Sequence, residues 1–370
     1  MRRPSTLALL LICIMTVAAC GGQPTDQVDE GTSSESGASE ASSADAAGSG
    51  PDGRAALVIA QGGLGDESYN DLALEGFERG LEANGVDGTP VESDDIVAQG
   101  EQILRRAADT DFGLVVDLEF SHGEILGPIA QDYPDVQWAI ANTVVEADNV
   151  TSLLFAEHEG SYLAGALAAL MTSTPDNEKI NPRKVIGVIG GTKSTGIDKF
   201  IVGFIQGARD IDPEVEVLHS YTDDFGDPAI GREQANAMFE QGADIVYQVA
   251  GGTGQGVIEA AADANRYAIG VDTDQDALAP GNVLTSMIKR IDVAVEETVT
   301  RWAGGELTGG ETLNFGLAED GVGLSEFEHT REEIPDEYIE QIEDLRSQIE
   351  SGELEVWNVI DQGYPDFFSE

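Results

Sequence analysis

The sequence predicts an α/β protein of two lobes, each built around a doubly wound parallel sheet. Short runs of almost continuous apolar residues recur along the chain, which is typical of strands covered on both faces. Helix-length amphipathic stretches separate these runs, as in doubly wound folds. The alternation runs from Arg54 to about Ala156 and starts again at Lys184, which predicts a second sheet. No obvious linker separates the two, so the lobes are expected to share hinge segments.

The apolar runs predict seven strands and set the positions of the helices between them. The expected strands are 55–60, 113–120, 136–141, 184–191, 215–221, 244–250 and 267–272. In the first expected helix Ser68 can act as the N-cap, and Ala73, Phe77 and Leu81 recur along one face. Helices are also expected at 161–172 and 198–211. Ligands of open parallel sheets bind beyond the carboxyl ends of the strands, so two facing lobes predict one cleft.

The first residues predict an export signal. Arg2 and Arg3 precede the apolar segment LALLLICIMTV, which is too short to span a membrane as a stable helix. The segment leads into VAAC, which resembles a bacterial lipobox, so 1–19 is expected to be a lipoprotein signal peptide removed before a lipidated Cys20. The alternative is an ordinary signal peptide followed by a chance cysteine. The other cysteine, Cys13, lies in the removed segment, so the mature chain can form no internal disulfide.

Residues 20–53 predict a flexible acidic tether. Gly, Ser, Ala, Asp and Glu dominate this stretch, and almost no apolar surface is available to offset the entropy of ordering it. Together with the anchor, this tether would hold the folded part at the outer side of the cytoplasmic membrane.

The charge of the whole chain is strongly acidic. Lys and Arg total 19 and Asp and Glu total 69, which gives a formal net charge of −50. Nucleic acid is therefore not expected as a partner, because phosphate binding needs a basic surface. Two explanations of the charge stay open. One is a halophilic source, in which salt screens the repulsion, and the other is a high-GC coding bias that depletes lysine.

Two glycine-rich loops follow expected strands, GGLGDESYND at 62–71 and GGTGQG at 251–256. Neither has the spacing G-x-G-x-x-G or the GK[ST] of a P-loop, so neither predicts a nucleotide-phosphate site. Backbone N–H groups at the start of a helix could still bind an anion there, or the glycines could simply permit tight turns.

The residues predict a binding protein rather than an enzyme, with no metal and no cofactor. The four histidines lack the spacing of metal ligands, and no G-x-S-x-G nucleophile motif is present. Asp117 and Glu119 could form an acid/base pair at a strand end. Two carboxylates at this spacing are expected by chance in so acidic a chain, which argues against catalysis there.

Seven motifs occur in the order found in one known protein family. They are GGLGDESYN (62–70), YPDVQWAIAN (133–142), FAEHEGSYLAGALAALM (155–171), DDFGDPAIG (223–231), GGTGQGVIEAA (251–261), AIGVDTDQ (268–275) and TSMIKRIDVAV (285–295). With the export signal they resemble the basic membrane protein family of substrate-binding lipoproteins, the nucleoside-binding components of ABC importers. The resemblance covers nearly all of 55 to 325.

The resemblance implies a fold of the type I periplasmic binding protein class, in which the chain crosses between the lobes three times. The crossings are expected near Ala156, near Thr285 and near Phe315. Lobe 1 would then comprise 54–156 and 286–314, and lobe 2 would comprise 157–285 and 315–370. The helix after the second crossing would pack on lobe 1, and the C-terminal helix at 336–351 would pack on lobe 2.

The resemblance also implies the function and the partners. The expected protein is a lipid-anchored monomer that binds a nucleoside, preferably a purine nucleoside, in the cleft and delivers it to the permease subunits of an ABC transporter. In the family the base lies between aromatic rings, and charged side chains hold the ribose.

The family's binding residues are carried over onto matching positions. Tyr69, where the family usually has phenylalanine, and Phe225 would stack on the two faces of the base. Asp272 would accept hydrogen bonds from the ribose hydroxyls, and Lys289 would donate to them. The remaining expected contacts are Gly252, which permits close backbone approach, and Ser68 and Asn70, which lie in the glycine-rich loop.

Two positions depart from the family pattern. The family usually places aspartates where this chain has Gln61 and Asn142, and these aspartates are expected to face the edge of the base. An amide offers both an acceptor and two donors, whereas a carboxylate only accepts. The resemblance therefore implies a broadened or shifted base preference, unless the alignment is off by one residue and Ala60 occupies the position of Gln61.

Several other functions stay open. The same fold could bind a sugar or an autoinducer, with a pocket richer in Asp, Asn and Arg and with weaker ring stacking. The protein could be a surface receptor that senses a ligand without transporting it. A transcriptional regulator would need a helix-turn-helix and no export signal, and an exported nucleoside hydrolase would need a Ca²⁺-binding aspartate cluster, for which SDDIVAQGE is not convincing.

Overall fold

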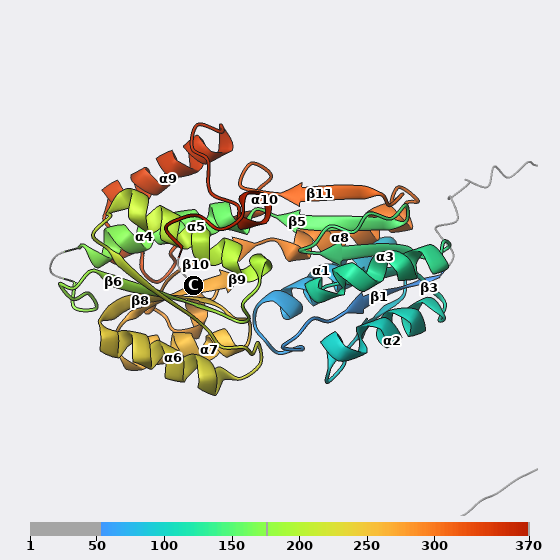
Figure 1. The fold of residues 1–370 in the computed structure, drawn as a ribbon, viewed down its shortest axis with the longest axis horizontal. Coiled ribbons are helices and arrows are strands. Elements are labelled where there is room, and N and C mark those ends of the chain that lie inside the picture. The colour runs from blue at the N-terminus through green and yellow to red at the C-terminus, as the bar shows by residue number, and fades with distance from the viewer. Residues whose placement is uncertain (1–52, 175–176, 369–370) are drawn as a thin grey trace, which may run out of the picture. The chain divides into compact units, whose positions relative to one another are not determined.

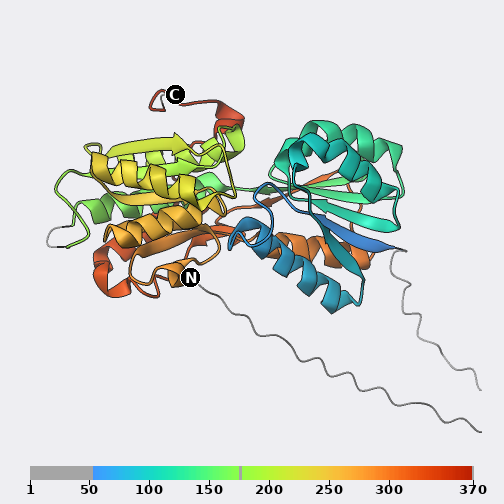
Figure 2. The same cartoon turned by 90° about the horizontal axis from the view of Figure 1, so that it is seen from below.

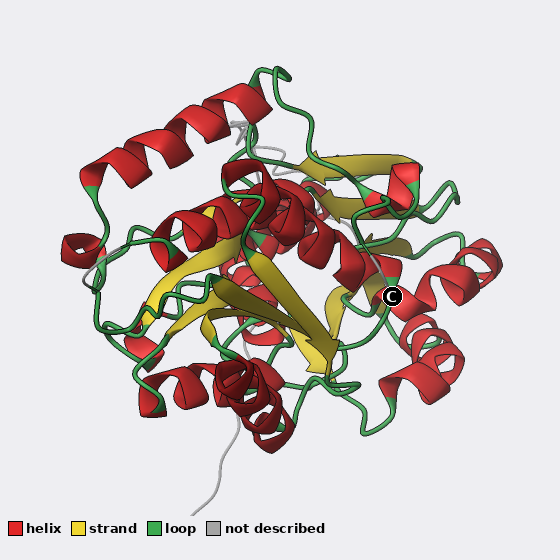
Figure 3. Ribbon diagram, turned by 60° about the vertical axis from the view of Figure 1, so that its left-hand side comes forward, coloured by secondary structure: helices red, strands yellow, loops and turns green. Residues whose placement is uncertain are grey.

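Two six-stranded sheets, each covered by helices on both faces, form the fold of residues 53–174 and 177–368, which the computed structural model describes (Figure 1). The predicted signal peptide, the lipidation site Cys20 and all but the last residue of the tether at 20–53 lie outside the described residues. The predicted α/β class with two doubly wound sheets is confirmed. Helices surround the strands of both sheets when the structure is turned, as the colouring by secondary structure shows (Figure 3).

The first sheet is entirely parallel, with the strand order β11-β5-β4-β3-β1-β2. Its strands are β1 (Arg54–Val58), β2 (Gly88–Val91), β3 (Phe112–Asp117), β4 (Gln137–Ala141), β5 (Val150–Phe155) and β11 (Glu311–Phe315). Helices α1 (Tyr69–Asn84) and α8 (Ile291–Ala303) pack against each other on one face, and α2 (Ile96–Ala108) and α3 (Gly123–Asp132) pair on the other. Alternate residues of β1 enter different cores, with Leu57 in the core of α1 and Val58 in the core of α2.

The second sheet has the order β12-β10-β9-β8-β6-β7 and is parallel except at one edge, where β12 runs antiparallel to β10. Its strands are β6 (Val185–Gly190), β7 (Glu216–Tyr221), β8 (Ala243–Val249), β9 (Tyr267–Asp272), β10 (Val283–Lys289) and β12 (Val322–Leu324). The covering helices are α4 (Glu157–Thr172), α5 (Thr195–Ile211), α6 (Pro228–Gln241) and α7 (Thr253–Asp263). The pairs α4–α5 and α6–α7 lie on opposite faces, as Figures 1 and 2 show.

Three short 3₁₀ turns and two C-terminal helices complete the described chain. The turns are Phe120–His122, Asp276–Leu278 and Arg331–Glu333, and the helices are α9 (Asp336–Glu350) and α10 (Val359–Gln362). Helix α9 packs on α4, and α10 packs on α5, so both cover the second sheet. Among the described residues, no helix combines the length and the apolar character needed to cross a membrane.

The chain passes between the sheets after Phe155, after Lys289 and after Phe315. The second passage lies later than the sequence predicted, because β10 continues through residues 286–289 in the second sheet. These residues pair with β9 on one side and with β12 on the other, so they cannot leave the sheet near Thr285. Residues 286–289 therefore belong with the second sheet and not with the first.

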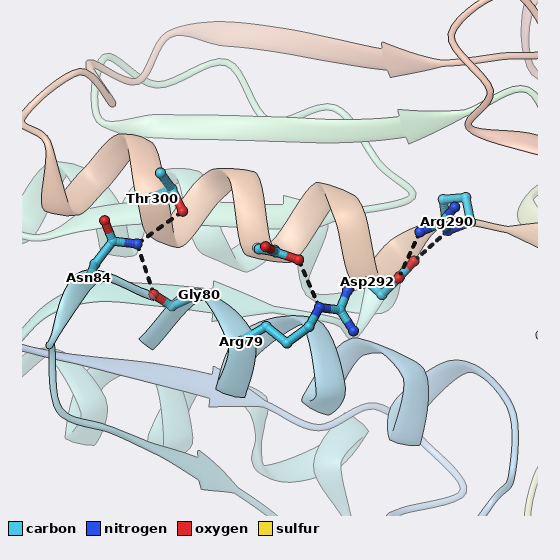
Figure 4. A network of polar contacts seen from close by, with 7 residues as sticks. Arg79, Gly80, Asn84, Arg290, Asp292 and Thr300 are labelled. Atoms are coloured by element: carbon cyan, nitrogen blue, oxygen red, sulfur yellow. Dashed lines mark hydrogen bonds and ion pairs between the residues drawn. The ribbon is translucent and has the colours of Figure 1, made fainter. Parts of the chain in front are cut away.

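Helix α8 follows the second passage and docks closely on α1 in the first lobe (Figure 4). A Cβ atom at Gly76 would lie only 2.1 Å from the backbone oxygen of Asp292, so glycine permits the contact. Arg79 binds both Asp292 and Glu296, and Asn84 donates to Thr300. These contacts hold the end of the second passage against the first lobe.

Candidate functional site

A pocket lies where the carboxyl ends of the strands of the two sheets face each other, as expected for open parallel sheets. It contains about 690 Å³ of space not filled by protein atoms, part of it open to solvent. Apolar and polar groups share its walls. The lining residues are Ala60, Gln61, Asp66, Tyr69, Asn70, Leu118, Glu119, Phe120, Asn142, Glu157, Gly196, Ile197, Phe200, Phe225, Val249, Gly251, Val271, Asp272 and Lys289.

The strand order arranges the first wall from the hinge outward. Glu157 follows β5, Asn142 follows β4, Glu119 follows β3 and Gln61 follows β1. Adjacent parallel strands lie about 4.8 Å apart, so these side chains form a row that begins beside the passages between the lobes. The last strand in the row, β2, leads to Glu92 at an outer, polar cleft that adjoins the pocket.

The second wall follows the same direction. Lys289 ends β10 and Asp272 ends β9, and both lie at the hinge side. Gly251 follows β8, and Phe225 comes from the loop after the edge strand β7. The ring of Phe225 packs on Gly191, where a Cβ atom would lie 2.2 Å from the ring. Charged groups therefore lie at the hinge end of the pocket, and an aromatic ring lies toward its mouth.

A buried cluster of three charges forms the hinge end. Glu157 Oε1 lies 2.9 Å from Lys289 Nζ, and its Oε2 lies 2.5 Å from Lys199 Nζ. All three side chains are at most 3% exposed. Burial opposes ionisation of Glu157, but the two ammonium groups outweigh it and hold the pKa of Glu157 below its usual value. Burial lowers the pKa of Lys199, against the attraction of Glu157. The cluster retains one excess positive charge when both lysines are protonated.

Lys289 connects this cluster to the first lobe. Its Nζ donates to Asn142 Oδ1 at 2.7 Å, and the Asn142 amide donates to the Tyr69 hydroxyl at 2.9 Å. The Tyr69 hydroxyl in turn donates to the Leu118 carbonyl at 3.1 Å. The ammonium group lies 4.9 Å from the centre of the Tyr69 ring and 4.8 Å from that of Phe155, within the range of cation–π attraction. Asn142 thus orients both the aromatic ring and the cation.

Asp272 is a second carboxylate at the hinge end. It accepts a hydrogen bond from Ser68 Oγ at 2.7 Å, which joins the glycine-rich loop of the first lobe to the second lobe. Burial raises the pKa of Asp272 to about 6, although Lys289 and Ser68 act in the opposite direction. Asp272 has a positive φ of 68°, in the left-handed region that Asp and Asn adopt more readily than most other residues with a Cβ atom.

Glu119 is a third carboxylate, farther toward the mouth. Its Oε1 accepts from the Gln61 side-chain amide at 3.3 Å and from Ser121 N at 3.1 Å, and its Oε2 accepts from Gln61 N at 3.1 Å. The side chain is fully buried although it lines the pocket. The neighbouring His122 contacts Asp117 at 2.8 Å through Nδ1 and the Ile96 carbonyl at 3.0 Å through Nε2.

His122 has an acceptor at each ring nitrogen, which is the pattern expected of a protonated imidazole. Burial opposes the charge, but Asp117 outweighs it and raises the pKa of His122. Burial raises the pKa of Asp117, against the contribution of His122. The geometry favours the ionised pair, because the ring can donate to the carboxylate and to the carbonyl at the same time only when both ring nitrogens carry a proton.

The structure brings seven of the nine residues expected to bind ligand to the pocket wall: Gln61, Tyr69, Asn70, Asn142, Phe225, Asp272 and Lys289. Ser68 and Gly252 do not line the pocket. Ser68 lies behind the wall and holds Asp272, while a Cβ atom at Gly252 would lie 3.2 Å from the Phe225 carbonyl oxygen. Gly251, the preceding residue, lines the pocket instead.

Several lining residues were not assigned a binding role from the sequence. Glu119 was noted only for possible catalysis, and Glu157, Phe120 and Phe200 received no role. The sequence motif FAEHEG contains Glu157, but only the buried contacts with two lysines distant in sequence reveal what it does. Within 53–174 and 177–368, no three His, Cys, Asp or Glu side chains are arranged to hold a metal ion.

Comparison with known proteins finds one family along most of the chain. Residues 54–358 match the family described as "ABC transporter substrate-binding protein PnrA-like". A CD4+ T-cell-stimulating antigen of Listeria monocytogenes is 32% identical over 322 residues, covering 81% of this chain and 87% of that protein. The ABC transporter nucleoside-binding protein BmpA of Lactococcus lactis is 31% identical over 304 residues, covering 76% and 84%. An uncharacterised lipoprotein of Pyrococcus abyssi is 31% identical over 285 residues, covering 73% and 68%.

The fold is also found in solved structures. An ABC transporter solute-binding protein from Aeropyrum pernix superposes with a TM-score of 0.74 at 28% identity, covering 82% of this chain and 93% of that one. The overall fold of the described chain is thus similar to that of a solute-binding protein of an ABC transporter.

Glu157→Gln is expected to lower the free energy of unfolding by about 3–5 kcal/mol, because it leaves two buried lysines without their shared carboxylate. Urea denaturation followed by circular dichroism measures the change. Glu101→Gln is the matched control, because Glu101 is 66% exposed in its ion pair with Arg105 and should contribute less than about 1 kcal/mol. Equal effects of the two substitutions would contradict a stabilising role for the buried cluster.

Proposed function

The chain belongs to the PnrA-like family of ABC transporter substrate-binding proteins, and from this premise we propose that its substrate is a nucleoside bound between the two lobes. Proteins of this family bind their substrate and do not convert it chemically. Nucleoside binding itself is supported by the relative from Lactococcus lactis, which is named for it, and by the walls of the pocket.

The observation that carries the proposal is the division of the pocket into two chemically different ends. Lys289 and Asp272 lie at the hinge end and offer a donor and an acceptor, which suits the two neighbouring hydroxyls of a ribose. Tyr69 and Phe225 come from different lobes and offer aromatic faces to a flat base. A nucleoside has these two parts in the same order, a neutral diol at one end and a planar ring at the other.

The apolar lining argues against a simple sugar as the substrate. Leu118, Phe120, Phe200, Val249 and Val271 all line the pocket, and none of them can satisfy a hydroxyl. A monosaccharide carries polar groups all round its ring, and burying them against such walls would leave hydrogen bonds unmade at a cost of about 1–3 kcal/mol each. The side chains therefore favour a ligand with one large apolar face.

Delivery of the nucleoside to the permease subunits of an ABC transporter is the role that we infer for the bound state. Both lobes line the pocket, and Ser68, Glu67 and Gly65 of the first lobe are bonded to Asp272, Gln275 and Gln255 of the second. Closure of this kind buries the ligand and joins the two lobe surfaces into one continuous face, which a permease could distinguish from the open form.

Attachment to the membrane through a lipid on Cys20 is part of the proposal, and VAAC at 17–20 motivates it. The mass of protein extracted from membranes should correspond to a chain that begins at Cys20 with a diacylglyceryl group. Cys20→Ala should release the protein from the membrane fraction, because the thiol that is proposed to carry the lipid anchor is then absent. Unmodified wild-type protein in the medium would refute the anchor.

Guanosine or inosine should raise the melting temperature of the purified protein, because a ligand that binds only the native state stabilises it. Phe225→Ala should remove most of this shift, since loss of one stacking face costs about 1–3 kcal/mol per base. Phe225→Tyr keeps the ring and serves as the control. If no nucleoside changes the melting temperature of the wild type, or if the alanine variant responds as the wild type does, the proposed binding mode is wrong.

Nucleoside affinity should fall as the pH is lowered from 7 to 5. The ionised form of Asp272 accepts hydrogen bonds from the ribose hydroxyls, and its pKa of about 6 means that protonation removes this acceptor in that range. Calorimetric titrations at several pH values measure the change. Asp272→Asn should bind more weakly and show little change over the same range; an equally steep pH profile in this variant would assign the effect to another group.

A further inference from the structure

The pocket contains a carboxylate for which the proposed ribose contacts leave no role. Glu119 lines the pocket, is fully buried and forms no ion pair within hydrogen-bonding distance among the described residues. A fully buried carboxylate is costly unless hydrogen bonds or charges compensate for the lost water. Glu119 receives three N–H groups, two from Gln61 and one from Ser121, while an ionised carboxylate can accept about four.

The distribution of these bonds identifies the oxygen that is still available. Oε1 accepts two hydrogen bonds, from the Gln61 side chain and from Ser121 N, whereas Oε2 accepts one, from Gln61 N. Oε2 therefore keeps the capacity to accept a further N–H from a ligand. All three donors of this set are protein groups that hold the carboxylate in place before a ligand arrives.

The position of Glu119 places it at the base end of the pocket. It follows β3, which lies two strands from the hinge strand β5 and next to β1, at whose end Gln61 lies. Lys289 and Asp272, the proposed ribose contacts, end strands at the hinge side. A nucleoside whose sugar lies at the hinge end extends its base toward Glu119.

The two amides that the sequence places at the base edge are already engaged. Asn142 donates to Tyr69 and accepts from Lys289, and Gln61 donates to Glu119 through both its backbone and its side chain. These contacts leave the amides less free to read a base than their positions in the sequence imply. The carboxylate absent from positions 61 and 142 is supplied by the neighbouring strand, and Gln61 orients it.

We propose that Glu119 determines the base preference of the pocket by accepting a hydrogen bond from a ring N–H. This inference rests on the proposed nucleoside binding and specifies its substrate class. Guanine, hypoxanthine and uracil carry a ring N–H on their Watson–Crick edge. Adenine and cytosine present a ring nitrogen lone pair at that position, which an ionised carboxylate repels. Nucleosides of the first group therefore bind more tightly than those of the second.

Two buried charged groups lie close to Glu119. His122 lies three residues away and is held as an imidazolium between Asp117 and the Ile96 carbonyl. The imidazolium attracts the Glu119 carboxylate, and Asp117 repels it. Asp66 and Glu157, which also line the pocket, have different bonding partners. Asp66 accepts three backbone N–H groups of its own loop, and Glu157 is paired with two lysines.

Calorimetry with guanosine and 1-methylguanosine tests the inference on the unaltered protein. The methyl group replaces only the ring N–H, so wild-type protein should bind 1-methylguanosine about 10- to 100-fold more weakly, as expected for the loss of a hydrogen bond to a charged group. The wild-type protein should likewise bind inosine more tightly than adenosine. Equal affinities within each pair would overturn the role of Glu119 while leaving nucleoside binding intact. Absence of binding by every nucleoside would overturn the proposed function as well.

The variant Glu119→Gln provides a second test of the same inference. The variant should lose most of the preference for guanosine over 1-methylguanosine and for inosine over adenosine. Glu92→Gln is the matched control, because it removes the same charge after β2, two strands from β3 in the same sheet, but Glu92 does not line the pocket, and the variant should keep both ratios. Melting temperatures of both variants report folding. A folded Glu119→Gln protein with the wild-type affinity ratios would show that Glu119 only connects the loops of Gln61 and Ser121 through hydrogen bonds and does not set the base preference.

Discussion

The buried ion pairs of Glu157 with Lys199 and Lys289 are the interaction on which the hinge and the pocket both depend. Glu157 follows the first passage between the lobes, Lys289 precedes the second, and Lys199 comes from a helix of the second lobe. Three charges at this depth are tolerated only together, because removal of any one leaves the others uncompensated. The same cluster sets the orientation of Lys289 toward the proposed ribose site. The three side chains belong to the second lobe, and the hydrogen bond from Lys289 to Asn142 joins the cluster to the first lobe, so a change in the angle between the lobes acts on this bond.

The residues that line the pocket change in a regular order from this cluster outward. Neighbouring strands of a parallel sheet end side by side, so each successive strand places its terminal residue farther from the hinge. The first wall passes from Glu157 through Asn142 and Glu119 to Gln61, and the second passes from Lys289 to Phe225. The buried cluster of Glu157, Lys199 and Lys289 lies at the hinge, and Glu119 and the ring of Phe225 lie nearer the mouth. The two ends of the pocket therefore differ in chemical character.

Many of the strands could be predicted from the amino-acid sequence, and each strand that was not predicted has a physical reason. The apolar runs predicted the central strands β1, β3, β4, β6, β8 and β9, which are covered on both faces, and also the edge strand β7. The other edge strands were not predicted: β2 and β11 contain few buried residues, β2 contains Pro90, and β12 has only 3 residues. Strand β5 was missed although it is buried, because Thr151 and Ser152 interrupt its apolar pattern. Strand β10 was not among the predicted strands, and the second passage was placed too early, because pairing with β9 and with the distant β12 keeps residues 286–289 in the sheet.

The sequence by itself determined the α/β class, the two sheets and seven of the residues that line the pocket, because hydrophobic periodicity and short motifs are local properties of the chain. Only the tertiary structure decided how those residues work. Ser68 supports Asp272 from behind, Asn142 orients Tyr69 and Lys289, and Gln61 holds Glu119. Each of these partnerships joins residues that are 58 or more positions apart. Which oxygen of a carboxylate is left free depends on where the other donors come from, and that is a property of the folded chain alone.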